Sequence, residues 1–342
     1  MILARRNLEL KGRRILVIGG AGLIGSHIVD ELVKTDVAEV IIYDNFFRGS
    51  RDNLKEALKD PRVSIFADGG DILHPDILAR AMEGIDGVFH LAALWLLQCH
   101  EYPRSAFDVN IRGTFNVIEA AIKNNVKRVV YSSSASVYGD ALEIPMTEKH
   151  PYNNFTFYGA TKIAGEHMFK ALGHRYGLNW VGLRYMNVYG PRQDYKGAYI
   201  AVMMKMLDRI DSGLSPEVFG DGGQQYDFIY VSDVARANVF AMQAETTGKN
   251  YNVGRGVGTS IKELAELLLR LSDSNLKIDF KPAGQTFVTN RIGSTRAAET
   301  DLGFKWQIHL EEGMRRLIEW RRADVKAVEA RRELALTSRE TK

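Results

Sequence analysis

Apolar residues in the first half of the chain follow two alternating patterns. Short apolar runs without polar alternation, such as residues 15–18 and 40–43, are typical of strands buried on both faces of a parallel sheet. Between these runs, apolar residues recur at the spacing of one helix face, as in helices that cover a sheet. The pattern predicts strands at 15–18, 40–43, 63–66, 87–91 and 126–131, and helices at 26–34, 76–82 and 106–124.

The second half of the chain begins regularly and then changes. A helix at 158–176 and a strand at 180–184 continue the alternation. This alternation predicts an α/β fold with a doubly wound parallel sheet and right-handed crossovers. Past residue 185 the pattern is irregular and indicates a smaller C-terminal lobe built from insertions on the main sheet. It predicts helices at 198–210, 233–242, 260–271 and 310–336, and strands at 227–230, 251–253 and 278–280.

Three glycines follow the first predicted strand, at Gly19, Gly22 and Gly25. The first allows a tight turn, the second lets backbone N–H groups approach a pyrophosphate, and the third lets the next helix lie close to the strand. Asp44 ends the second strand about 20 residues later, where an acid binds a ribose 2′-hydroxyl. A carboxylate there repels a 2′-phosphate, so the pattern predicts a Rossmann-type site for NAD rather than NADP. The alternative is a simple glycine turn with a solvated aspartate.

Composition narrows the class of protein. The chain has 342 residues and a formal net charge of +3, and no basic run is interleaved with aromatic residues, so a nucleic-acid partner is not expected. Cys99 is the single cysteine, which excludes an internal disulfide and favours a reducing compartment. No apolar stretch is long enough to span a membrane, and residues 1–11 lack the apolar core of a signal peptide. We therefore expect a cytoplasmic protein without a membrane partner. The histidines and carboxylates show no metal-ligand spacing, so no metal is expected.

Tyr158 and Lys162 lie four residues apart and would share one helix face. A free phenol has a pKa of about 10 and is a poor base at neutral pH. A lysine one turn away and a positively charged nicotinamide would both lower that pKa and make the phenol a usable general base. The alternative is a solvated helix face. A run of serines, 132–134, ends the fifth predicted strand, at the edge where a sheet of this type holds its ligand.

At this point the chain resembles the extended short-chain dehydrogenase/reductases, in the branch of nucleotide-sugar epimerases and dehydratases. The resemblance extends from about residue 13 to 322, nearly the whole chain, with the motifs in order and at family spacing. The matching segments are 19–25, Asp44, 71–72, 90–93, 132–139, Tyr158 with Lys162, 184–191, 219–222, 227–228 and 231–235.

The resemblance implies a role for each matching residue. Ser134 would hydrogen-bond the sugar hydroxyl that is oxidised, Tyr158 would remove its proton, and Lys162 would hold the nicotinamide ribose and tune Tyr158. Asp71 and Ile72 would flank the adenine, and Ala92 and Ala93 would lie along the cofactor. The NAD site implied in this way consists of Gly19, Gly22, Leu23, Ile24, Gly25, Asp44, Asn45, Asp71, Ile72, Leu91, Ala92, Ala93, Tyr158 and Lys162.

The two residues after Ser134 bear on the type of reaction. Dehydratases of the family carry an Asp-Glu pair there and decarboxylases keep the glutamate, whereas this chain has Ala135 and Ser136. The resemblance therefore implies an epimerase that inverts C4 of a nucleotide sugar, most simply a UDP-hexose or a derivative, through a transient 4-keto intermediate. The alternatives are an NAD-dependent sugar oxidoreductase, a dehydratase-like enzyme on a different nucleotide sugar, and a non-catalytic NAD-binding protein.

The substrate contacts depart from the family pattern at two places. Tyr226 stands where the family usually has an arginine for the nucleotide diphosphate. A second phosphate arginine of the family, expected shortly before Thr295, does not align, and Lys281 and Arg291 are the candidates to replace that one. Trp95 stands where small residues usually face the sugar, and Gln98 and His100 follow it as candidate sugar contacts. For Asn187 and Arg184 the alternative is strand-end hydrogen bonding, which is also expected of Ser132 and Ser133. The expected substrate site consists of Ser134, Ser136, Asn187, Trp95, Tyr226 and Arg291.

Domain boundaries and the oligomeric state follow from the same resemblance. Residues 1–185 are expected to form the NAD-binding domain with the catalytic helix, and residues 186–325 mostly the substrate-binding lobe, interleaved with the main domain. Residues 326–342 would be a charged tail. In relatives the helices equivalent to 106–124 and 157–176 build a dimeric four-helix bundle, so the resemblance implies a homodimer.

Overall fold

The structure, a computed structural model, describes residues 8–193, 201–283 and 289–323. Its centre is a sheet of seven parallel strands in the order β11-β6-β5-β4-β1-β2-β3. The α/β fold with a doubly wound parallel sheet is confirmed. The strands are β1 (Arg14–Ile18), β2 (Glu39–Tyr43), β3 (Val63–Ile65), β4 (Gly87–His90), β5 (Arg128–Ser134), β6 (Trp180–Tyr185) and β11 (Lys249–Val253).

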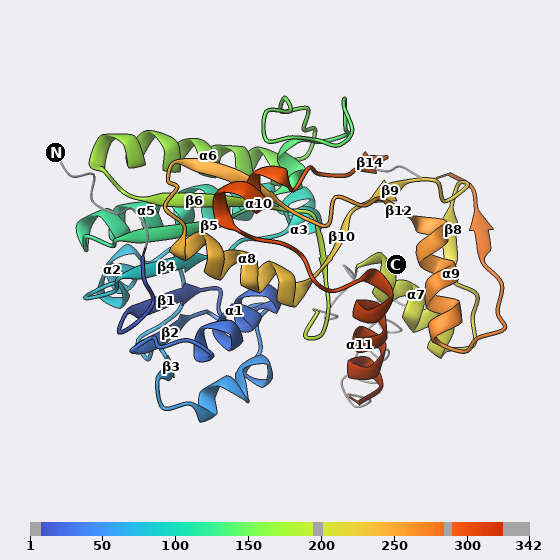
Figure 1. The fold of residues 1–342 in the computed structure, drawn as a ribbon, viewed down its shortest axis with the longest axis horizontal. Coiled ribbons are helices and arrows are strands. Elements are labelled where there is room, and N and C mark those ends of the chain that lie inside the picture. The colour runs from blue at the N-terminus through green and yellow to red at the C-terminus, as the bar shows by residue number, and fades with distance from the viewer. Residues whose placement is uncertain (1–7, 194–200, 284–288, 324–342) are drawn as a thin grey trace.

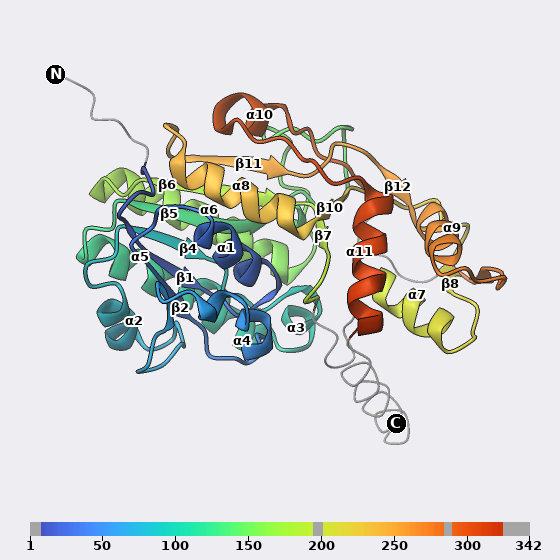
Figure 2. The same ribbon diagram turned by 60° about the horizontal axis from the view of Figure 1, so that its bottom comes forward.

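Helices cover both faces of this sheet, as Figures 1 and 2 show. Alternate residues of one strand enter different cores. Ile15 and Val17 of β1 pack with Ile28 of α1, whereas Leu16 and Ile18 pack with Val117 of α5. Burial on both faces explains why β1 is apolar at every position after Arg14. The covering helices are α1 (Leu23–Val33) and α8 (Val231–Gln243) on one face, and α2 (Pro75–Ala81), α5 (Thr114–Lys123) and α6 (Phe157–Tyr176) on the other.

The smaller lobe has a core of its own, formed by α7 (Val202–Asp211), α9 (Ile261–Leu271) and α11 (Leu310–Ala323). It lies at the right-hand end of the molecule in Figure 1. Its strands are short and paired in three small sheets. They are β7 (Asn187–Tyr189) with β10 (Phe228–Tyr230), β8 (Glu217–Phe219) with β13 (Asp279–Lys281), and β9 (Gln225–Tyr226) between β12 (Thr259–Ser260) and β14 (Asn290–Arg291).

Several elements differ from the sequence-based expectation. The strand expected at 251–253 exists as β11, but it extends the main sheet beside β6 rather than lying in the lobe. The single helix expected at 106–124 consists of α4 (Pro103–Ala106), a π-helical segment (Phe107–Gly113) and α5. The elements not expected are α3 (Leu96–Glu101), the 3₁₀ turn Ala135–Val137, α10 (Arg296–Leu302) and the short strands β7, β8, β9, β12 and β14. Two further 3₁₀ turns lie at Arg51–Leu54 and Ala57–Lys59.

Parts of other predictions lie outside the described residues. These are the start of the helix expected at 198–210, the end of the helix expected at 310–336, and the charged tail at 326–342. The division into domains at residue 185 stays a prediction. Among the helices that the structure describes, none has both the length and the apolar character needed to cross a bilayer.

Candidate active site

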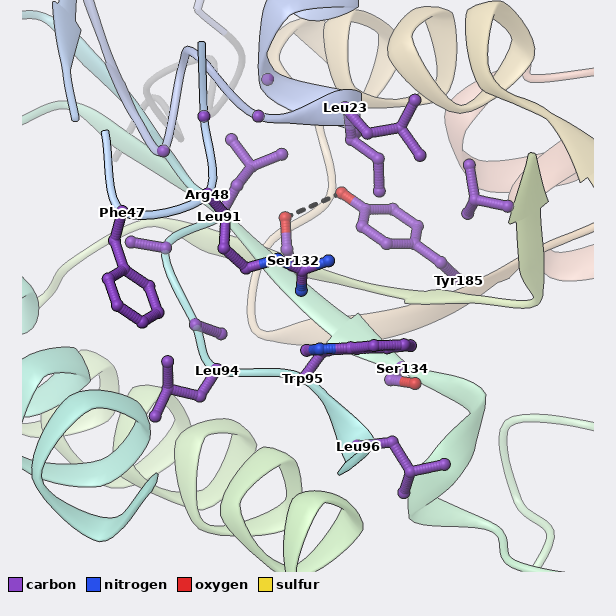
Figure 3. A pocket seen from close by; sticks show the side chains of 18 of the residues that line it. Leu23, Phe47, Arg48, Leu91, Leu94, Trp95, Leu96, Ser132, Ser134 and Tyr185 are labelled. Atoms are coloured by element: carbon purple, nitrogen blue, oxygen red, sulfur yellow. Dashed lines mark hydrogen bonds between the residues drawn. The ribbon is translucent and has the colours of Figure 1, made fainter. Parts of the chain in front are cut away.

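A large cavity lies at the carboxyl ends of the central strands, with a volume of about 1340 Å³. Its walls come from the loops after β1, β2, β4 and β5, from the start of α6, and from the lobe. Figure 3 shows part of this cavity, with Leu91, Trp95 and Ser134 around one space. All the residues assigned to NAD from the sequence line this single cavity.

At Gly19 and Gly25, the glycine-rich loop after β1 has no room for a side chain. Gly19 has a φ of +80°, and a Cβ there would lie 2.9 Å from the backbone N of Ala92. A Cβ on Gly25 would lie 2.1 Å from the backbone O of Gly19, which shows how closely α1 approaches the loop. Gly22 caps α1 in an extended conformation, and a Cβ there would meet nothing nearer than 3.4 Å. The loop therefore leaves open space in front of the positive end of the α1 dipole, which suits a pyrophosphate.

Asp44 is held at the tip of β2 by the backbone. Its Oδ2 accepts a hydrogen bond of 2.8 Å from the N–H of Ala21, and its Oδ1 accepts one of 2.8 Å from the N–H of Phe46. Burial raises the pKa of this carboxyl, and the two N–H groups counter the rise. Among the described residues, no basic side chain lies within ion-pair distance of Asp44. The carboxylate can accept further bonds from ribose hydroxyls, while a 2′-phosphate would face an uncompensated negative charge.

The next acid of the predicted NAD site is engaged with its own loop. Asp71 accepts a hydrogen bond of 2.9 Å from the N–H of Leu73, and its backbone oxygen accepts one of 2.8 Å from the phenol of Tyr43. Ile72 is buried, and a Cβ on Gly113 would lie 2.5 Å from its Cδ1. The segment is therefore rigidly placed at the cavity wall.

The three candidate catalytic side chains meet in the cavity. Ser134 ends β5, and its Oγ accepts a bond of 3.1 Å from the N–H of Ser136. Tyr158 lies in the first turn of α6, whose N-terminus is capped by the Thr156 side chain. Lys162, one turn further along α6, donates a bond of 2.7 Å to the backbone O of Ser132. Its ammonium lies 5.7 Å from the centre of the Tyr158 ring.

Burial dominates the ionisation of this group. It raises the pKa of Tyr158 to about 12, although a hydrogen bond with Ser134 and the charges of Arg48 and Arg291 act in the opposite direction. Burial also lowers the pKa of Lys162 to about 8. The expected lowering of the Tyr158 pKa by Lys162 therefore does not occur in the chain alone, because desolvation of the phenolate outweighs the nearby positive charges.

A buried ion pair fixes β6 against α6 behind these residues. Glu166 accepts bonds of 2.8 and 2.7 Å from the guanidinium of Arg184 and one of 2.6 Å from the hydroxyl of Ser133. The hydroxyl of Ser132 lies 2.9 Å from that of Tyr185, as drawn in Figure 3. The alternative role, structural hydrogen bonding, therefore describes Arg184, Ser132 and Ser133. Their hydrogen-bond partners are mostly side chains.

The expected substrate residues are only partly brought together. Ser136, Asn187, Trp95 and Arg291 line the same cavity as Ser134 and Tyr158. Tyr226 does not line it, and its ring lies 6.2 Å from that of Phe228 between centres. Asn187 also makes the strand-end bond that was its alternative, donating to the backbone O of Asp227 at 3.2 Å.

Two further findings concern residues near Trp95. Neither Gln98 nor His100 is part of the cavity wall; both belong to α3. Arg48, which sequence reasoning missed, lines the cavity, and its guanidinium carbon lies 4.8 Å from the centre of the Trp95 ring. No motif marks Arg48, because it lies in a loop that joins the sheet to a short 3₁₀ turn. Among the described residues, no cluster of three or more acids, histidines or cysteines could hold a metal ion.

Comparison with known proteins gives the same family throughout. The model of the NAD dependent epimerase/dehydratase family matches residues 15–254. The UDP-glucose 4-epimerase of Mycolicibacterium smegmatis is 33% identical over 90% of this chain and 98% of its own. The dTDP-glucose 4,6-dehydratase of an Actinoplanes species is 31% identical over 91% of this chain and 98% of its own. Among solved structures, UDP-N-acetylglucosamine 4-epimerase from Methanobrevibacter ruminantium is similar with a TM-score of 0.85 and 32% identity, covering 91% of this chain and 98% of that one.

Proposed function

The chain belongs to the NAD-dependent epimerase/dehydratase family, and from this premise we propose that it is a 4-epimerase of a UDP-hexose or a derivative. The observation that carries the proposal is the set of groups around Tyr158. Ser134, Tyr158 and Lys162 line one cavity with the glycine loop, and no carboxylate accompanies them at that end. The acids among the described lining residues are Asp44, Asp52, Asp71 and Asp108, and none of them lies on β5 or α6, the elements that carry Ser134 and Tyr158.

The residues of the chain suit NAD at its expected place. Gly19 and Gly25 make the close turn, Gly22 leaves room for the pyrophosphate, and Asp44 would accept bonds from the adenosine ribose. The chemistry that NAD supplies when bound is the reversible acceptance of a hydride from carbon.

The chain itself would move one proton. Ser134 would orient the 4-hydroxyl of the sugar, and Tyr158 would take its proton and later return it. With a pKa of about 8, Lys162 keeps most of its positive charge at neutral pH and stabilises the developing phenolate. Because the proton and the hydrogen return to the same molecule, the cycle needs no external reductant, and return to the opposite face inverts C4.

The absence of a carboxylate beside Ser134 separates this proposal from the other reactions of the family. Elimination across the sugar ring needs one group to protonate the leaving hydroxyl and another to abstract a carbon-bound proton. Ala135 and Ser136, both buried, offer neither. Glu166, the nearest acid along α6, is fully engaged with Arg184 and Ser133.

Arg291 is our candidate for the diphosphate of the substrate. Strand β14 pairs in parallel with β9, and Arg291 stands directly opposite Tyr226, where the family arginine is missing. Its Nε is buried without a hydrogen-bond partner in the described part of the chain. A guanidinium can bind a phosphate through two hydrogen bonds, which a phenol cannot do.

The direct test is the interconversion of UDP-glucose and UDP-galactose by the wild type and by Tyr158→Phe. We expect the wild type to form the C4 epimer and the variant to lose activity by at least about 100-fold, because the general base is gone while the ring remains. Product would be measured by NMR, and bound NAD would be measured in the denatured protein. Full activity of Tyr158→Phe would contradict the role assigned to Tyr158. The NAD content is measured because a variant that has lost its NAD says nothing about the general base.

We also propose a homodimer in the cytoplasm. Phe107, Phe115 and Phe157 are exposed on the neighbouring helical segments around α5 and α6, and an apolar helix face of this kind is suited to pairing with a second copy. Light scattering of the purified protein would give the oligomeric state.

A further inference from the structure

Trp95 occupies an unusual place in the cavity. It immediately precedes α3, with extended backbone, and its indole projects across the space next to Ser134 in Figure 3. The guanidinium of Arg48 lies over the indole, 4.8 Å from the ring centre. The two residues come from different loops, after β4 and after β2, so the contact joins these loops across the cavity. Moving the indole aside would break a cation–π contact that is partly shielded from water.

The position of the indole matters because of what inversion requires. The reacting carbon must lie beside Ser134 and Tyr158 in both halves of the reaction. To receive hydrogen on its other face, the sugar ring has to turn over within the cavity, so its substituents pass through the space next to these residues. A wall as bulky as an indole limits the size of the substituents that can pass.

The two neighbours of Trp95 in the chain are apolar. Leu94 and Leu96 line the cavity on either side of it in the chain. An acetamido group turned against these leucines and the indole would lose its hydrogen bonds to water without gaining partners from them. A hydroxyl is smaller and loses less.

We infer that Trp95, held in place by Arg48, is a specificity-determining residue that restricts the enzyme to hexoses without an N-acyl substituent. The inference rests on the proposed function and narrows its substrate class. It excludes UDP-N-acetylhexosamines as efficient substrates by steric overlap and by unpaired polar groups.

The test compares kcat/KM for UDP-glucose and UDP-N-acetylglucosamine in the wild type, Trp95→Ala and Trp95→Phe. We expect the wild type to prefer UDP-glucose by on the order of 100-fold, and Trp95→Ala to reduce this preference about tenfold or more through faster turnover of the N-acetyl substrate. Trp95→Phe should lie between the two and covers the case in which the alanine variant folds poorly. Tyr102→Ala is the matched control, since Tyr102 is an exposed aromatic residue of the same segment outside the cavity wall, and it should leave the preference unchanged.

Two results would overturn the inference: equal use of both sugars by the wild type, or an unchanged preference in both Trp95 variants. Dissociation constants of the two nucleotide sugars on Tyr158→Phe separate this inference from the proposed function. Equal dissociation constants of the two nucleotide sugars on Tyr158→Phe, in which Trp95 is intact, would be a third result that overturns the inference. Selective binding of UDP-glucose without turnover by the wild type would instead refute epimerisation and leave the role of Trp95 standing.

Discussion

Opposing influences act on the phenol of Tyr158. Burial raises its pKa to about 12, whereas Ser134, Arg48 and Arg291 lower it. The chain alone therefore holds the phenol neutral, and the positive charge of a bound nicotinamide would have to lower its pKa further for proton removal near neutral pH. The sequence allows Ser134, Tyr158 and Lys162 to be predicted as site residues, because their residue types and spacing form a motif. It was uninformative about Arg48, which reaches Trp95 only through the folding of two separate loops.

The contribution of Ser134 can be measured from the pH dependence of kcat/KM. Because the base must be deprotonated, activity falls on the acidic side of its pKa. Ser134→Ala removes a hydrogen bond that lowers the pKa of Tyr158, so the acidic limb should move to higher pH and activity at pH 7 should fall on the order of 100-fold. Ser134→Thr keeps the hydroxyl and should leave the limb near its wild-type position. An acidic limb at the same pH in wild type and alanine variant would contradict this role.

Long elements and strands buried on both faces could be predicted from the sequence. Very short strands, and the pairing of strands that lie far apart in the chain, could not. β1 and β2 are apolar at nearly every position because both faces are covered, and such runs are visible in one sequence. β9, β12 and β14 have two residues each, too few to show a period. β11 was visible as a strand, but its place beside β6 depends on a partner that lies far away along the chain. For the same reason the pairing of Arg291 with Tyr226 could not be foreseen.

The glycine loop and α1 allow stability and cofactor binding to be separated. Gly25→Ala places a Cβ 2.1 Å from the backbone O of Gly19, so the helix must shift, and we expect a loss of about 1–3 kcal/mol in the free energy of unfolding. Gly22→Ala has no such conflict, since the nearest atom is 3.4 Å away. That variant should unfold like the wild type but retain less NAD, because the methyl group occupies the space left for the pyrophosphate. Calorimetry would measure the stability of both variants, and the NAD content of denatured samples would measure cofactor retention. Wild-type stability of Gly25→Ala, or full NAD content of Gly22→Ala, would contradict these expectations.

In the whole molecule, the cavity lies where the lobe meets the ends of the main strands, and polar contacts hold the two parts in register. Asp140, after β5, accepts hydrogen bonds of 3.0 Å each from the backbone N–H groups of Thr289 and Asn290, which brings β14 to the catalytic end. The backbone N–H of Met146 donates a 2.8 Å bond to Ile292 in the same segment. These contacts place Arg291 close enough to Tyr158 to affect its ionisation. Cofactor residues from the sheet and substrate residues from the lobe thus share one space.

In the proposed reaction, hydrogen leaves C4 of a UDP-sugar and returns to the same carbon. The measurement that tests it most directly uses UDP-galactose with deuterium at C4, incubated with the purified protein without added cofactor, and follows the product by NMR. We predict UDP-glucose that retains its deuterium at C4, with no exchange into water and no accumulating keto sugar. Loss of the label to solvent, a dehydrated or keto product, or no reaction with any UDP-hexose would contradict the claim.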